Sequence, residues 1–227
     1  MPGARSNTSR FLTLTPTLLL LLAIAGLGSC NIVGPVAYLV HGPPKVKAKF
    51  ELDPDRKVVF FVDDRANRLP RRTLKNVIGQ SAEETLINQG GADPEQVIAS
   101  RSATLAASTE TNSDLMSIAA VGKAVGADRV VYISIEGFSI SRDGATVQPQ
   151  AGALIKVIDV EEDRRIWPAD RKGFPVKVQL PAAGTPIPPD RAGVNRIQIG
   201  LAEVLGVQIA RAFFEHERDA LSGSLDD

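Results

Sequence analysis

The chain has 227 residues, of which 44% are hydrophobic and 23% charged, as is typical of a globular protein with one sizeable core. Its 26 lysines and arginines equal its 26 aspartates and glutamates in number. The composition therefore lacks the excess of positive charge that marks nucleic-acid-binding proteins, and we expect no nucleic-acid partner.

The first 29 residues have the layout of a secretory signal. Arg5 and Arg10 form a positive start without acidic residues, the run 18–27 is apolar, and small residues follow it up to Ser29. The run is shorter than the roughly 20 residues that a membrane-spanning helix needs. A buried core helix would show a polar face, which this run lacks. We therefore predict a signal peptide over residues 1–29.

The segment Leu27-Gly28-Ser29-Cys30 holds the only cysteine of the chain and resembles a bacterial lipobox. The resemblance implies signal cleavage between Ser29 and Cys30, a diacylglycerol group on the Cys30 sulfur and an N-acyl chain on the new amine. One acyl chain binds a membrane only marginally, whereas two or three bind it firmly. We expect no cofactor besides these chains, no metal, and a membrane as the first partner.

Asn31 follows the cysteine, at the position where aspartate favours retention in the inner membrane under the enteric sorting rule. The resemblance therefore implies a lipid-anchored protein of the cell envelope that faces the periplasm. An outer-membrane location is favoured over an inner-membrane one.

Residues 30–55 are interrupted by turn-forming pairs. Gly34-Pro35, Gly42-Pro43 and Asp53-Pro54 argue against regular structure. We predict a tether, with some extended pairing over residues 46–52, that could lift the following domain off the membrane surface.

A single domain is predicted over residues 56–218. It begins with a buried strand over 56–64, a run of β-branched and aromatic residues with polar ends. A helix should follow from Pro70 to about Asn88, ending at Gly90-Gly91. Its apolar residues recur at spacings of three and four and so form one face; they are Leu74, Val77, Ile78, Ala82 and Leu86.

The middle of the chain predicts a short strand over 96–100 and a loop over 101–112. A helix should begin after Ser113 as its N-cap and end at Gly126. A strand over 130–135 should follow, because that stretch is again apolar and β-branched.

The last third predicts a meander and a closing helix. The predicted elements are a turn at 142–144, a long strand over 151–160, a turn at 161–164, a return to Trp167, a strand over 174–180, a proline-rich connection over 181–190, a helix over 192–218 and a disordered tail over 219–227.

Together these elements predict an α/β sandwich of two or three layers. Crossover helices separate the first three strands, which should therefore be parallel to one another. The later strands should be antiparallel, so the sheet should be mixed, and the C-terminal helix should close the domain.

The segments VGKAVGADRVVYISIEGF (121–138) and ALIKVIDVEEDRRIW (153–167) resemble a recurring envelope module. It occurs in the amino-terminal domain of the Tol-Pal translocation protein, in the curli-secretion lipoprotein and in lipoproteins that activate peptidoglycan synthases. The matching residues are Gly126-Ala127-Asp128, Val157-Ile158-Asp159-Val160 and Ile166-Trp167.

This resemblance covers about residues 57–167 and implies an adaptor-type domain. The chain is too short to include the propeller of the Tol-Pal protein. It also lacks a pair of alternating segments suited to the membrane hairpins of the curli protein.

Two groups of charged residues are candidate sites. Asp63 and Asp64 follow the first strand, where open α/β sheets often bind ligands; they could hold a metal ion or do acid/base work, or form a solvated turn. Neighbouring aspartates on a strand point to opposite faces. Arg71, Arg72 and Lys75 should lie on the first helical turn, where the dipole disfavours cations, and could mark an anionic partner or a solvated face.

Few other residues offer chemistry. The two histidines, His41 and His216, are predicted to be exposed in the tether and near the tail. Trp167 should pack in the core or in a hairpin. The sequence contains no G-x-S-x-G, P-loop or H-E-x-x-H motif.

The leading hypothesis is therefore a non-catalytic, membrane-anchored envelope lipoprotein. Its domain would bind a protein partner in envelope transport, secretion or cell-wall assembly. The alternative is a lipoprotein that binds a small molecule or glycan beside Asp63 and Asp64, and an enzyme is the third hypothesis.

Overall fold

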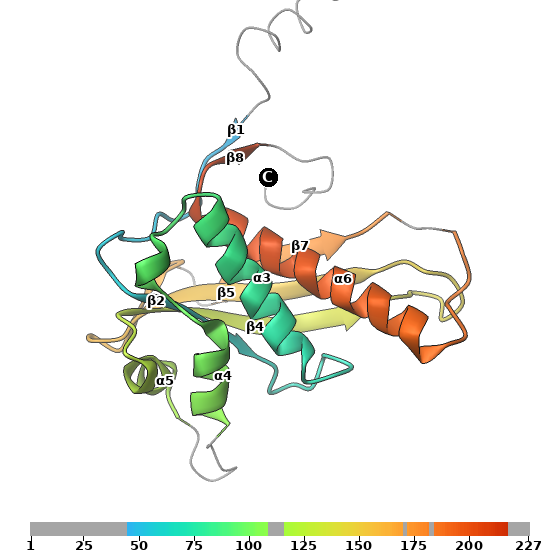
Figure 1. Ribbon diagram of the computed structural model, residues 1–227, viewed down its shortest axis with the longest axis horizontal. Helices are drawn as coiled ribbons and strands as arrows, with labels where there is room; N and C mark the ends of the chain where they lie inside the picture. Colours follow the sequence, from blue (N-terminus) through green and yellow to red (C-terminus); the bar gives the residue numbers. More distant parts are fainter. Residues whose placement is uncertain (1–44, 109–115, 170–171, 182–183, 218–227) are drawn as a thin grey trace, which may run out of the picture. The chain divides into compact units, whose positions relative to one another are not determined.

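The computed structural model describes residues 45–108, 116–169, 172–181 and 184–217, which belong to one compact unit, Lys45–Asp227 (Figure 1). The predicted signal peptide, Cys30 and His41 lie outside the described residues, and so does the predicted tail. Within the described part, no helix is both long and apolar enough to cross a bilayer.

A mixed sheet forms the centre of the domain, as predicted. Among the described residues it has six strands, in the order β3-β2-β4-β5-β6, with β7 also paired to β5. The pairs of β2 with β3 and β4 are parallel, and β5 is antiparallel to β4, β6 and β7. The strands are β2 Val58–Asp63, β3 Val97–Ile98, β4 Arg129–Ser139, β5 Gln150–Asp159, β6 Arg164–Trp167 and β7 Phe174–Gln179.

Strand β2 lies inside the sheet and is covered on both faces. All six of its residues are buried, which explains why its sequence is a continuous apolar run and not an alternating one. Val58, Phe60 and Val62 belong to the core on one face, and Val59 and Phe61 to the core on the other.

Helices α3 (Leu74–Asn88) and α6 (Arg191–Ala210) cover the first face. They cross in front of β4, β5 and β7 (Figure 1). Gly206 permits their close approach, since a Cβ on it would lie 2.5 Å from the carbonyl oxygen of Ile78. The Ser81 hydroxyl donates a hydrogen bond to the carbonyl oxygen of Glu203 across the same contact, at 2.8 Å.

Helices α4 (Ser100–Ala107) and α5 (Ile118–Val125) pack on the second face, so the domain has three layers near β2. The loop predicted over 101–112 is therefore wrong up to Ala107. Its small residues looked loop-like, but alanine is the best helix former, and Ala103 is fully buried. The Ser117 side chain caps α5 by accepting from the Ala120 N–H, whereas Ser113 lies outside the described residues.

The closing helix ends earlier than predicted, at Ala210 and not near residue 218. A short 3-10 turn, η3 (Arg211–Phe213), follows it, and the backbone becomes extended at Phe214. The Ala212 carbonyl oxygen accepts hydrogen bonds from the N–H groups of Lys49 and Phe50. Strand β8 (His216–Glu217) then pairs with β1 (Lys45–Val46).

Trp167 packs against the core on the face covered by α3 and α6, as predicted. Its ring lies 5.6 Å from that of Phe50, 5.0 Å from Phe174 and 6.0 Å from Phe213, measured between centroids. Phe50 belongs to the segment predicted as tether, so part of that segment packs on the domain.

Candidate functional site

Asp63 ends β2 and lies on the face covered by α4 and α5. It is 8% exposed, and its carboxylate is bound by the protein itself. The Tyr132 hydroxyl donates to Oδ2 at 2.7 Å, the Arg65 N–H donates to Oδ1 at 3.1 Å, and Arg65 Nε lies 3.3 Å from Oδ2. An incoming ligand would have to displace these bonds.

The environment of Asp63 changes the acidity of its tyrosine neighbour. Burial raises the pKa of Tyr132 above its usual value, and the hydrogen bond to the Asp63 carboxylate raises it further. Lys156 Nζ lies 6.0 Å from the centre of the Tyr132 ring. Tyr132 therefore stays protonated and serves as a hydrogen-bond donor, not as a proton acceptor.

Asp64 points elsewhere and organises the loop after β2. Its Oδ1 accepts from the Arg68 N–H at 2.7 Å, and its Oδ2 accepts from the Leu69 N–H at 3.1 Å. The two aspartates thus bind different groups, as expected for neighbours at a strand end. Within the described ranges, no group of three His, Cys, Asp or Glu side chains could hold a metal ion.

The predicted cationic residues lie around the start of α3. Because the helix begins at Leu74, Arg71 and Arg72 precede it and only Lys75 lies on its first turn, which corrects the prediction. Arg71 Nε donates to Gln198 Oε1 of α6 at 3.1 Å. Arg71 Nη2 is buried and has no hydrogen-bond partner within the described residues.

Gly126, Asp128 and Asp159 build a corner between strands. Gly126 ends α5 with a φ of 74°, a conformation that glycine adopts without strain. The Asp128 carboxylate accepts from the Lys57 N–H at 2.8 Å, and the N–H groups of Asp128 and Arg129 donate to the Lys57 carbonyl oxygen. These bonds join the starts of the parallel strands β2 and β4.

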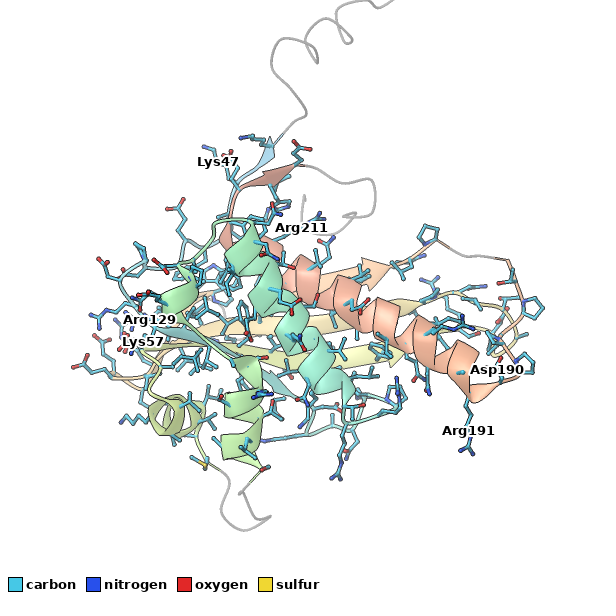
Figure 2. All side chains as sticks on the ribbon, in the orientation of Figure 1. Lys47, Lys57, Arg129, Asp190, Arg191 and Arg211 are labelled. Carbon is cyan, nitrogen blue, oxygen red and sulfur yellow. The ribbon has the colours of Figure 1, made fainter. Side chains whose placement is uncertain are left out.

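Asp159 completes the same corner from the end of β5. It is 6% exposed, accepts from the N–H groups of Glu161 and Glu162 at 3.0 Å, and pairs with Arg129. Burial acts to raise the pKa of Asp159, but the Glu162 hydrogen bond and the Arg129 charge outweigh it, so the pKa is lowered. We call Lys57, Asp128, Arg129 and Asp159 the strand corner; Figure 2 labels Lys57 and Arg129 there.

His216 is buried, with 8% exposure, contrary to the prediction of an exposed side chain. It lies in β8, whose pairing with Val46 of β1 the sequence pattern did not indicate. Its Nδ1 lies 3.1 Å from the Phe214 carbonyl oxygen, which can only accept, so Nδ1 carries the proton of that bond. Nε2 is buried without a partner in the described part of the chain.

Comparisons with known proteins show similarity to solved structures only. No protein-family model and no curated protein matches the chain. A PelC dodecamer from Paraburkholderia phytofirmans is similar with 13% identity and a TM-score of 0.41, over 75% of this chain and 97% of that one.

Two further solved structures are similar at the same level. Lipoprotein GNA1162 from Neisseria meningitidis has 11% identity and a TM-score of 0.38, over 63% of this chain and 93% of that one. A Xanthomonas campestris protein of the family DUF330 has 10% identity and a TM-score of 0.39, over 74% and 90%. A lipoprotein is thus among the similar structures, but TM-scores this low support no conclusion on family or function.

Sequence reasoning missed the partners of the candidate residues. Tyr132 reaches Asp63 across 69 positions of sequence, and Gln198 reaches Arg71 across 127. The signal for Tyr132 was its position on the strand paired with β2, which places it on the same face as Asp63. No comparable pattern pointed to Gln198.

Proposed function

We propose that this protein is a lipid-anchored lipoprotein of the cell envelope, that its anchor is Cys30, and that its domain is a non-catalytic adaptor for a protein partner. The partner would act in envelope transport, secretion or cell-wall assembly. Asn31 favours the outer membrane over the inner one, with the domain facing the periplasm.

The observation that carries the proposal is the placing of the single cysteine. Cys30 directly follows an apolar run and two small residues, behind a positively charged start. A thiol in this setting is suited to acylation, and two or three acyl chains would hold the protein firmly on a membrane.

The state of the two aspartates supports an adaptor over a ligand-binding protein. Both carboxylates at the end of β2 are engaged, Asp63 by Tyr132 and Asp64 by backbone N–H groups. A carboxylate that is already hydrogen-bonded within the fold has few free acceptor positions for a small ligand. Binding of a protein partner at the surface is therefore better supported than binding of a small ligand at these aspartates.

The intact mass of the detergent-extracted protein tests the anchor. We expect a chain that starts at Cys30 and is heavier by the mass of a diacylglycerol group and an acyl chain. Cys30→Ser should give a chain without these additions, and the control Ser29→Ala, which keeps a small residue before the cleavage site, should be processed and acylated. An unacylated chain, or one that retains residues 1–29, would overturn the proposal.

A crosslinking experiment tests the adaptor role. Envelopes that contain the wild-type protein should yield one reproducible crosslinked partner, identified by mass spectrometry. The Cys30→Ser protein, which lacks the acyl chains, should yield much less of the same partner. Absence of a reproducible partner at matched expression would count against an adaptor while leaving the anchor intact.

A further inference from the structure

Four cations gather around the start of α3, and none of them forms an ion pair within the described residues. Arg68 and Arg72 are exposed, and Arg71 and Lys75 are half-buried. Within the described residues, the side chains of Arg68, Arg72 and Lys75 make no ion pair and no hydrogen bond. We call these four residues the arginine end.

The acidic residues nearest in sequence do not neutralise these cations. Asp63 binds Tyr132 and the neighbouring Arg65, and Asp64 binds backbone N–H groups of the loop. The first turn of α3 contains no acidic residue, and Thr73 at its N-cap makes no side-chain cap. The positive charge of the arginine end therefore remains available to an external group.

Arg71 is held in place beside the two exposed arginines. The Nε bond to Gln198 fixes the guanidinium between the start of α3 and α6. Its Nη2 is buried and lacks an acceptor among the described residues. A buried charged donor without an acceptor is costly. A carboxylate would bind the exposed Arg68 and Arg72 first and would satisfy Nη2 once the Arg71 side chain turns toward it.

We propose that the arginine end is the docking surface for an acidic segment of the partner protein. The proposal rests on the adaptor function and adds to it the chemistry of the partner. Arginine presents a planar fork that binds a carboxylate through two parallel N–H donors, and three of the four cations are arginines. A segment rich in aspartate or glutamate is the protein ligand whose charge matches these four cations.

The arginine end lies away from β1, where the described chain begins. α3 and α6 both begin at the end of the domain far from β1 and β8 (Figure 1). The described chain starts at β1, and α6 with its 20 residues spans about 30 Å. Figure 2 labels Arg191 at the first residue of α6 and Lys47 beside β1, and these two residues lie far apart.

The test uses the processed full-length chain in a neutral detergent, labelled with nitrogen-15, and a hexaglutamate peptide as the probe. The peptide should shift the amide signals of residues 68–75 and the Arg71 Nε–H signal. Arg72→Glu/Lys75→Glu should weaken binding at least ~10-fold at low salt, because two attractive charges become repulsive. The matched control Arg101→Glu/Lys123→Glu changes two exposed cations of α4 and α5 and should bind like the wild type.

Two results would overturn the proposal. The first is that the peptide gives no shifts, or that both double variants lose affinity equally, which would mean that only net charge matters. The second is that vesicles with phosphatidylglycerol shift residues 68–75 while the peptide does not, which would assign the arginine end to a lipid surface. Either failure is distinct from failure of the adaptor function, which the crosslinked partner tests independently.

Discussion

The strand corner and the arginine end use charged residues in opposite ways. In the strand corner, Asp128 and Asp159 accept backbone N–H groups, and Asp159 also holds Arg129. In the arginine end, Arg68, Arg72 and Lys75 meet no acidic side chain within the described residues.

This difference separates charge used for folding from charge left for binding. Removing a paired, buried carboxylate destabilises the protein, because the partner of that carboxylate is left unsatisfied. An unpaired surface cation contributes almost nothing to stability and can even oppose it. Charges that the fold does not need are therefore the better candidates for recognition, and four variants test this division.

Asp159→Ala should have the largest effect, a loss of about 3 kcal/mol in the free energy of unfolding. The change removes the anion that pairs with Arg129, whose side chain is only 16% exposed. It also leaves the N–H groups of Glu161 and Glu162 without their acceptor. Urea unfolding at neutral pH measures it. The control Glu161→Ala removes an exposed carboxylate of the same turn and should change stability by less than about 0.5 kcal/mol.

The effect of Asp159 should depend on pH. Its pKa is lowered from 3.8, so its contribution is present above that value and is lost as the pH falls through the folded-state pKa. The gap between wild type and Asp159→Ala should therefore shrink in acid. A gap that stays constant down to strongly acidic pH would show that the carboxylate acts through packing and not through its charge.

Asp64→Ala should cost about 2 kcal/mol, because the N–H groups of Arg68 and Leu69 lose their acceptor. It should also weaken hexaglutamate binding, since this loop carries part of the arginine end. Asp64→Asn keeps one carbonyl oxygen and should retain about half of the 2 kcal/mol that Asp64→Ala loses. If Asp64→Ala left both stability and binding unchanged, the loop would not depend on this carboxylate.

Tyr132→Phe should cost about 1 kcal/mol at about pH 8 through the lost hydrogen bond to Asp63. Because the Tyr132 pKa is raised above 10.0, its contribution is complete below that pH and is lost as the pH rises through the folded-state value. Wild type should therefore lose more stability than the variant between about pH 8 and about pH 11. Asp63→Asn should lower the tyrosine pKa in an ultraviolet titration; an unchanged value would leave burial as the whole cause.

Much of this fold follows from the sequence pattern. The β2 run, the apolar stripe of α3 and the hairpin that ends at Trp167 have strong periodicity or turn residues, and all three are confirmed. The main failures are α4 and the end of α6. There the deciding contacts are tertiary: Ala103 is buried against the sheet, and β8 pairs with β1, which is far away in the sequence.

The candidate residues were harder to interpret, for a related reason. The sequence correctly indicated that Asp63 and Asp64 would point apart, since that depends only on strand geometry. The partners Tyr132 and Gln198 come from distant elements, and the burial of His216 depends on the β1–β8 pair. Contacts between residues far apart in the sequence therefore decide which polar side chains are buried or hydrogen-bonded within the fold.

Arg72→Glu/Lys75→Glu should have the smallest effect and the opposite sign, a gain of about 0.5 kcal/mol in the free energy of unfolding. The substitution removes repulsion within the arginine end and places acidic residues at the start of α3, where the helix dipole favours them and where none stands now. Urea unfolding of the double variant beside Arg101→Glu/Lys123→Glu measures it. A more stable protein that no longer binds hexaglutamate would show that these cations are kept at the expense of stability, as a binding surface requires. A destabilised variant would place them among the charges that the fold needs, and the contrast with the strand corner would disappear.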